Sequence, residues 1–121
     1  MKFCLVIGSN SFSGANFVNF ILNKKIKVIG VSRSKELNKV FLPYKYNSNI
    51  KNFKFYKINI NKHKELKNLI KIIKTNNIKH IINFSSQGMV GESWITPLDW
   101  YQTNSFSQIK LFEYLKNLNL K

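Results

Sequence analysis

The stretch VIGSNSFSGANFVNF, from Val6 to Phe20, governs how the rest of the chain is interpreted. It begins as an apolar strand, breaks at Gly8 and becomes helix-like after Gly14. Gly8 permits a tight turn that a side chain would obstruct, and Gly14 lets the helix approach the strand closely. Backbone N–H groups at the start of such a helix can face an anion, helped by the helix dipole. The stretch predicts a strand–turn–helix unit that holds a phosphate, with an ordinary tight turn as the alternative.

Strand and helix patterns alternate along the whole chain. Apolar runs predict buried strands, and apolar residues at helical spacing predict helices packed on a sheet. A short helix followed by a loop is expected over Ser34–Ser48, and a polar loop over Ser85–Thr96. The predicted strands are Lys2–Ile7, Ile26–Ser32, Phe53–Ile58 and His80–Phe84, and the predicted helices are Phe12–Asn23, Lys62–Asn76 and Pro97–Leu118.

This alternation predicts an α/β fold, a Rossmann-like parallel sheet with helices on both faces. Four strands and a terminal helix make about the first half of a doubly wound sheet, so the architecture is expected to be incomplete. If the chain stops at Lys121, the fourth strand has no neighbour on its outer side, and its open edge invites pairing. We expect one domain over residues 1–121.

Length and composition favour a single globular domain. The chain has 121 residues, of which 44% are hydrophobic, and no apolar run reaches the length of a membrane span. The apolar run that follows Lys2 is too short for a signal peptide. Cys4 is the single cysteine and cannot form an internal disulfide, so it is expected to be a packing residue. A cytoplasmic protein is the expectation.

The formal net charge of +15 admits a nucleic-acid partner. Arg33 is the only arginine among the 20 basic residues, however, and arginine is the preferred residue for bidentate recognition of bases and phosphates. We interpret the lysines as a compositional bias over a solvated surface. A small basic nucleic-acid-binding module remains the alternative, although it gives no reason for the glycine turn.

Two motifs carry a resemblance to a known family. IGSNSFSG, from Ile7 to Gly14, resembles the T-G-x-x-G-x-x-G fingerprint of the extended short-chain dehydrogenase/reductase family, with Ile7 in place of threonine and Ser11 in place of the middle glycine. HIINFSSQGMVGESWITPLDWYQTN, from His80 to Asn104, resembles the segment after the fourth strand in that family's NAD(P)-dependent epimerases and dehydratases. The whole chain resembles the N-terminal part of nucleoside-diphosphate-sugar 4,6-dehydratases such as GDP-mannose 4,6-dehydratase.

The resemblance implies a role for each matching residue. Val90 and Ser93 are expected to meet a nucleotide-sugar substrate, and Trp94 and Trp100 to be packing residues. Asn104 is expected to help organise the proton relay. The residues expected to bind the cofactor are Gly8, Ser11, Phe12, Gly14, Arg33, Asn59, Ser85, Ser86, Gln87 and Asn104.

The end of the second strand bears on the choice of cofactor. An acidic residue there binds the ribose hydroxyl of NAD, and an arginine accommodates the 2′-phosphate of NADP. The sequence VSRSK places Arg33 and Lys35 there and no acid. NADP is therefore the preferred cofactor and NAD the second choice. Asn59 ends the third strand, where the family usually carries an aspartate that meets the adenine.

The catalytic pair of the family is missing from these residues. The family's chemistry needs a Tyr-x-x-x-Lys pair as general acid/base, and no tyrosine here has lysine four positions later. His63 and His80 lack metal-ligand partners at useful spacing. We expect the isolated chain to be inactive. It would be the NAD(P)-binding portion of an enzyme that transfers a hydride at the sugar C4, completed as a homodimer or by a C-terminal chain. A stand-alone nucleotide-binding module is the other alternative.

Overall fold

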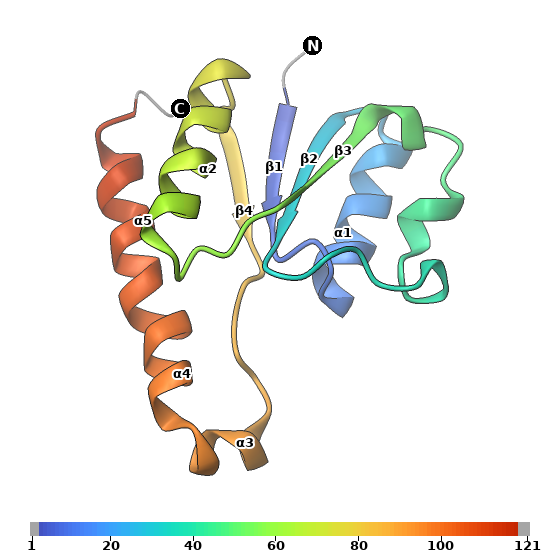
Figure 1. The fold of residues 1–121 in the computed structure, drawn as a ribbon. Coiled ribbons are helices and arrows are strands. Elements are labelled where there is room, and N and C mark those ends of the chain that lie inside the picture. The colour runs from blue at the N-terminus through green and yellow to red at the C-terminus, as the bar shows by residue number, and fades with distance from the viewer. Residues whose placement is uncertain (1–2, 119–121) are drawn as a thin grey trace.

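A computed structural model describes residues 3–118 of the chain. Four strands form one parallel sheet in the order β3-β2-β1-β4 (Figure 1). All four run in the same direction, so their carboxyl ends meet at one edge of the sheet. The Rossmann-like α/β fold predicted from the alternating pattern is confirmed. The strands are β1 (Phe3–Ile7), β2 (Lys27–Ser32), β3 (Phe53–Lys57) and β4 (His80–Asn83).

Helices cover both faces of the sheet. Helix α1 (Phe12–Asn23) lies on one face, and α2 (His63–Thr75) and α5 (Ser107–Lys116) lie on the other (Figure 1). The chain between β2 and β3 forms short 3₁₀ turns at Lys39–Phe41, Pro43–Tyr46 and Ile50–Asn52, where the sequence predicts a short helix and a loop.

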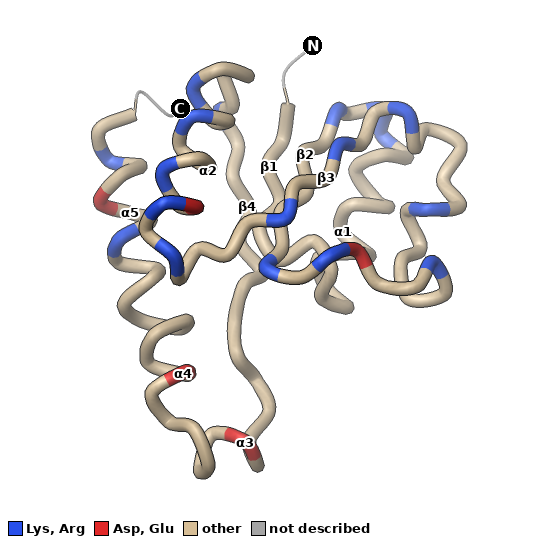
Figure 2. The backbone as a smooth tube through the Cα atoms, viewed as in Figure 1, with Lys and Arg blue, Asp and Glu red and all other residues tan. Residues whose placement is uncertain are grey.

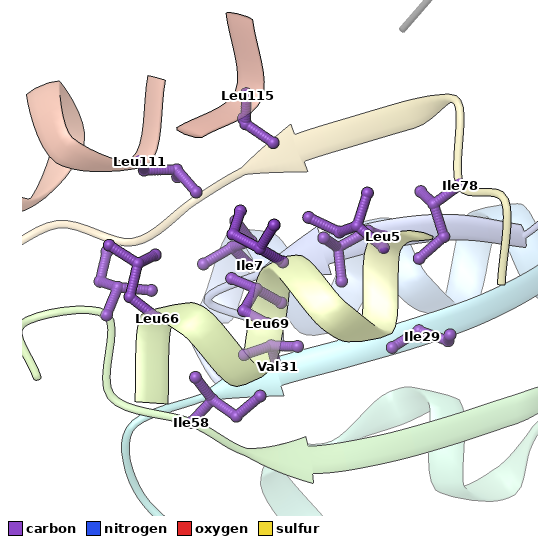
Figure 3. Close-up of a cluster of buried hydrophobic side chains, with 13 residues drawn as sticks. Leu5, Ile7, Ile29, Val31, Ile58, Leu66, Leu69, Ile78, Leu111 and Leu115 are labelled. Carbon is purple, nitrogen blue, oxygen red and sulfur yellow. The ribbon is translucent and has the colours of Figure 1, made fainter. Parts of the chain in front are cut away.

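The apolar runs of the two central strands, β1 and β2, are buried on both sides, as in other parallel sheets, whereas no residue of the outer strands β3 and β4 is fully buried. On one face, Leu5 and Ile7 pack against Leu66 and Leu69 of α2, with Leu111 of α5 beside them (Figure 3). A second cluster on the other face includes Cys4, which is 6% exposed. Burial raises the pKa of the Cys4 thiol to about 11, so the thiol stays protonated at neutral pH.

The segment after β4 differs from its predicted form in two respects. The expected polar loop over residues 85–96 contains a six-residue helix, α3 (Val90–Ile95). The expected single helix after Pro97 begins as α4 (Pro97–Tyr101) and continues into α5 through a π-turn at Gln102–Phe106. In this turn the Ser107 N–H bonds to the Gln102 carbonyl, five residues back, so the helix is locally widened.

Charge is unevenly distributed over the fold. Residues 80–109 contain no lysine or arginine, and Figure 2 shows none on α3 or α4. The same segment exposes large apolar side chains, of which the most exposed are Val90, Trp94, Ile95 and Leu98, each at least 75% exposed. No described helix is long and apolar enough to cross a bilayer.

The sheet ends at β4 within the described part of the chain. β4 pairs with β1 through Cys4–His80, Leu5–Ile81, Val6–Ile82 and Ile7–Asn83, and no other described strand pairs with it. Phe84 donates its N–H to the Ile7 carbonyl at 2.8 Å. Backbone groups alternate in direction along a strand, so those of Ile81 and Asn83 are directed to the other edge. The open edge expected for the fourth strand is therefore present.

Candidate functional site

A cleft of about 270 Å³ opens at the carboxyl ends of the strands. It brings together segments that are far apart in the sequence: the turn after β1, the residues after β2, those after β3 and those after β4. Open α/β sheets bind ligands at this edge, where neighbouring connections leave the sheet in opposite directions. Of the residues expected to bind a cofactor, seven line the cleft: Gly8, Ser11, Arg33, Asn59, Ser85, Ser86 and Gln87.

The glycine turn forms the floor of the cleft. Gly8 has φ +80° and donates its N–H to the Val31 carbonyl at 2.7 Å. A Cβ on Gly14 would overlap the Gly8 carbonyl oxygen, so Gly14 allows α1 to approach the end of β1. Both glycines therefore have the steric roles predicted from the sequence. The phosphate-binding role of the turn stays a prediction.

Ser11, at the position of the fingerprint's middle glycine, caps helix α1. Its hydroxyl donates to the Gly8 carbonyl at 2.8 Å and accepts from the Gly14 N–H at 3.0 Å. The first intrahelical bond runs from Ala15 N to Ser11 O, so the amides of Phe12 and Ser13 have no acceptor inside the helix. These two donors lie at the positive end of the helix dipole, where an anion is stabilised. The Phe12 ring itself is 86% exposed.

Asn10 joins the glycine turn to the segment after β2, a role that the sequence did not reveal. Its backbone N–H donates to the Ser32 hydroxyl at 3.0 Å, and its side-chain amide donates to the Lys35 carbonyl at 2.8 Å. The Oδ1 atom of Asn10 is buried without a partner among the described residues. A buried polar atom without a partner is uncommon, and here it lies on a residue that lines the cleft.

Arg33 reaches across the cleft from the β2 side. Its Nη2 lies 3.4 Å from Oε1 of Gln87, which follows β4. The carboxylate next along the chain, Glu36, accepts from the Tyr44 hydroxyl at 2.9 Å and pairs with Lys45 at 2.8 Å. Glu36 is therefore held away from the end of β2, and Arg33 is the charged side chain that lines the cleft there.

Asn59 lies where β3 ends and forms the far wall of the cleft. Its backbone N–H donates to Glu65 Oε2 at 2.6 Å, and its Oδ1 accepts from the Asn61 N–H at 3.0 Å. The hydrogen bond from Asn59 holds the pKa of the Glu65 carboxyl below its usual range, with a smaller contribution from the charge of Lys62. Glu65 is therefore ionised at neutral pH and anchors this wall to the first turn of α2.

Residues 85–87 form the wall on the β4 side. The Ser85 N–H and hydroxyl both donate to Asn83 Oδ1, at 2.9 and 2.6 Å. Asn104 lies outside the cleft lining but bonds twice to Gln87: its Oδ1 accepts from the Gln87 N–H at 2.8 Å, and its Nδ2 donates to the Gln87 carbonyl at 3.0 Å. Asn104 thus fixes the backbone of this wall.

The two residues expected to meet the substrate lie on α3, away from the cleft lining. Val90 is 75% exposed, and the Ser93 hydroxyl donates to the Val90 carbonyl at 2.6 Å. Ser93 borders a separate shallow pocket together with Trp94 and Trp100. The prediction that Trp94 is a packing residue is wrong, because its side chain is 86% exposed. Trp100 is half-buried.

Nine residues that line the cleft were not among those expected to bind the cofactor. Ser32 and Ser34 flank Arg33 at the carboxyl end of β2. Both could have been predicted, because polar residues at the carboxyl end of a parallel strand commonly face the ligand. Thr103 comes from the π-turn, and no pattern in the sequence marks its approach to the cleft. The full set is Ile7, Ser32, Ser34, Leu37, Ile60, Asn61 and Thr103, in addition to Asn10 and Phe84.

Strands in the order 3-2-1-4, with a glycine turn on the first and a cleft at their carboxyl ends, define a Rossmann-type nucleotide-binding fold. The sequence profile of one such family, described as GDP-mannose 4,6 dehydratase, matches residues 5–121. The chain belongs to this family, within the extended short-chain dehydrogenases/reductases.

One curated relative and two solved structures are similar to the whole chain. The chain is 29% identical over 124 residues to a UDP-glucuronate 4-epimerase from Thermodesulfobacterium geofontis, covering 100% of this chain and 38% of the relative. It superposes with a TM-score of 0.82 on a UDP-glucose 4-epimerase from Bifidobacterium longum solved with NAD+ and UDP, at 27% identity over 99% of this chain and 35% of that one. A UDP-N-acetylglucosamine 4-epimerase from Methanobrevibacter ruminantium gives a TM-score of 0.78 at 23% identity, over 99% of this chain and 36% of that one. The chain thus spans little more than a third of the length of these relatives.

Proposed function

We propose that residues 1–121 form the NAD(P)-binding domain of a sugar-nucleotide 4,6-dehydratase or epimerase. The observation that carries the proposal is the single cleft in which the glycine turn, Arg33, Asn59 and the wall after β4 meet. The family and its relatives support it, since the relative from Bifidobacterium longum was solved with NAD+. The bound dinucleotide would accept a hydride from C4 of the sugar.

The chain's own residues bind and orient in this proposal. The free amides of Phe12 and Ser13 hold the pyrophosphate, aided by the dipole of α1. Asn59 faces the adenine, and Ser85 and Ser86 border the nicotinamide ribose. Val90 and Ser93, on helix α3 in the segment that follows this wall, meet the nucleotide sugar. None of the five tyrosines has lysine four positions later, so the general acid/base is assigned to no residue of this chain.

NADP is the proposed cofactor in preference to NAD. A cleft that binds the 2′-phosphate of NADP needs cations and hydroxyl donors at the end of β2, and Arg33, Ser32 and Ser34 line the cleft there. A cleft that binds the free ribose hydroxyl of NAD usually has a carboxylate at this place. Glu36 is occupied by Tyr44 and Lys45 and does not provide one.

The location of the site is tested by filling the cleft. Ser86 lines it and is exposed, so Ser86→Trp adds an indole to the cleft without disturbing the core. We expect NADPH to bind this variant at least about tenfold more weakly than the wild type, as followed by the change in NADPH fluorescence. Ser48→Trp, an equally exposed substitution in the segment before β3, is the control and should leave affinity unchanged. Equal affinity in all three proteins would place the site elsewhere.

The choice of cofactor is tested through Arg33. Arg33→Ala should weaken NADPH binding by about tenfold and leave NADH binding nearly unchanged, because a charge-assisted bond to the 2′-phosphate is worth about 1.5–3 kcal/mol before solvent exposure reduces it. Calorimetric titration of each dinucleotide measures both affinities. Lys39→Ala, in the 3₁₀ turn farther along, controls for the loss of one positive charge. Tighter binding of NADH than of NADPH by the wild type would refute the NADP preference.

The exposed apolar side chains of α3 and α4 support a further partner, either a second copy or a complementing C-terminal chain. We propose a homodimer in the complete protein through this surface, which carries no lysine or arginine. Sedimentation equilibrium of the wild type and of Leu98→Glu tests this proposal. We expect the mass of a dimer for the wild type and of a monomer for the variant. A wild type with the mass of a monomer, unchanged by Leu98→Glu, would refute the proposal.

A nucleic-acid-binding function is the second candidate, favoured by the net charge of +15. It predicts affinity that falls steeply with salt and depends on sequence. Binding that is weak and independent of sequence would be expected of any protein with this charge and would not support it.

A further inference from the structure

Asn61 connects the wall after β3 to the helix on the other side of the cleft. Its side-chain Nδ2 donates to the Thr103 hydroxyl at 2.9 Å, and its Oδ1 accepts from the Ser107 hydroxyl at 2.7 Å. Thr103 is 8% exposed and Ser107 is fully buried. Buried hydroxyls need partners, and Asn61 satisfies both of these at once.

Gln108 continues the connection to the wall after β4. Its Nε2 donates to the Thr103 carbonyl at 3.0 Å and to the carbonyl and hydroxyl of Ser85 at 3.2 Å each. Its Oε1 accepts from Asn83 Nδ2 at 2.6 Å. An unbroken series of hydrogen bonds therefore runs from Asn61, through the helix, to Ser85.

Because of the π-turn at Gln102–Phe106, this helix can form hydrogen bonds to both walls of the cleft. In an α-helix the Thr103 carbonyl would accept from the Ser107 N–H. Here that N–H bonds to the Gln102 carbonyl instead, and the Thr103 carbonyl accepts from the Gln108 side chain. The Gln102 side chain in turn donates to the Ser107 hydroxyl at 3.0 Å. π-turns inside helices occur frequently at functional sites, and this one lies beside the cleft that Thr103 lines.

We propose that Asn61, Thr103, Ser107 and Gln108 form a polar brace that sets the distance between the two walls of the cleft, with Asn61 as its positioning residue. This inference rests on the proposed function, because a dinucleotide is long enough to touch both walls whereas its adenine half touches one. A hydrogen-bonded network with every member satisfied holds its members in one arrangement. The brace therefore matters for ligands that span the cleft and not for ligands that occupy one side of it.

Asn61→Ala separates positioning from general stability. The substitution removes the bonds to Thr103 and Ser107 and retains the Asn61 backbone N–H that bonds Asn59. We expect NADPH to bind about tenfold more weakly, which corresponds to the loss of one or two hydrogen bonds, while adenosine 2′,5′-bisphosphate binds within about twofold of wild type. Equal weakening of both ligands would overturn the brace.

Asn47→Ala is the matched control. Like Asn61, Asn47 makes several side-chain bonds, to Asn19, Asn23 and Asn49, but it does not line the cleft. It should lower stability without separating the two ligands. If Asn61→Ala does not fold, Ser107→Ala removes one bond of the same brace and should show the same separation.

Amide hydrogen exchange tests the brace without a ligand. Asn61→Ala should accelerate exchange at the amides of Ser85 and Gln87, across the cleft, and Asn47→Ala should not. Wild-type protein that binds no dinucleotide would refute the proposed function, and the exchange measurement would still decide the brace. Unchanged exchange at Ser85 and Gln87 in Asn61→Ala would overturn it.

Discussion

Gly8→Ala is expected to destabilise the protein by about 3 kcal/mol and to abolish dinucleotide binding. Gly8 has φ +80°, a region that side chains disfavour. An alanine Cβ would also lie 2.7 Å from the Phe84 carbonyl carbon and 2.8 Å from the Ser85 amide nitrogen. Both are backbone atoms of the chain leaving β4, so relief requires that the wall after β4 move away from the glycine turn. Urea denaturation measures the loss of stability, and NADPH fluorescence the loss of binding.

Gly88→Ala is the matched control for this experiment. Gly88 lies three residues beyond Ser85 in the same segment, and a Cβ there would meet nothing within 4 Å. We expect its free energy of unfolding to stay within about 0.5 kcal/mol of wild type. Similar effects of the two substitutions would show that the turn tolerates a side chain, and the steric argument for the glycine fingerprint would fail.

Leu69→Ala is expected to lower the free energy of unfolding by about 2–5 kcal/mol. Leu69 is fully buried where α2 packs on the sheet, next to Leu66 and Val31 (Figure 3). Removing its isopropyl group leaves a cavity that a four-stranded sheet and a helix cannot close. For a domain of this size such a loss is a large share of the total stability.

Leu98→Ala makes the same chemical change at a residue of α4 that is 80% exposed. Its effect on the unfolding of the monomer should remain below about 0.5 kcal/mol. Urea denaturation of both variants at low protein concentration gives the comparison. A small effect at Leu69 would mean that the face of the sheet under α2 is not a packed core.

The fold was predictable because its signals are local. β2 differs from its predicted strand by a single residue, and α1 has the predicted bounds. β1 agrees with its prediction from Phe3 to Ile7, while Lys2, the first residue of that prediction, lies outside the described residues. Helix α2 was visible from its apolar spacing, and it buries Leu66, Leu69, Ile70 and Ile73. Helix α3 has only six residues, too few for a repeating apolar pattern, and none of them is buried, so the sequence predicted a loop there.

The candidate site was only partly predictable. Residues at the strand ends follow from the fold, which is why Arg33, Asn59 and Ser85 were found. Asn10 and Asn61 were missed because their roles depend on bonds to segments 22 to 46 residues away, which composition and spacing do not reveal. The exposure of Trp94 was missed for a related reason: an aromatic side chain next to a predicted helix is usually buried, and only the course of the chain decides whether anything covers it.

The uneven placement of the lysines gives the molecule an electric dipole, with one positively charged end and one end that carries only acidic charges. One pole is made by α2, α5 and the connections around β2 and β3, and the other by α3 and α4, whose charged residues are Glu92 and Asp99 (Figure 2). Two kinds of anion should therefore bind independently. A long polyanion such as heparin would bind the lysines of α2 and α5, whereas a dinucleotide would enter the cleft beside Arg33. NADPH should consequently still bind protein already held on a heparin matrix.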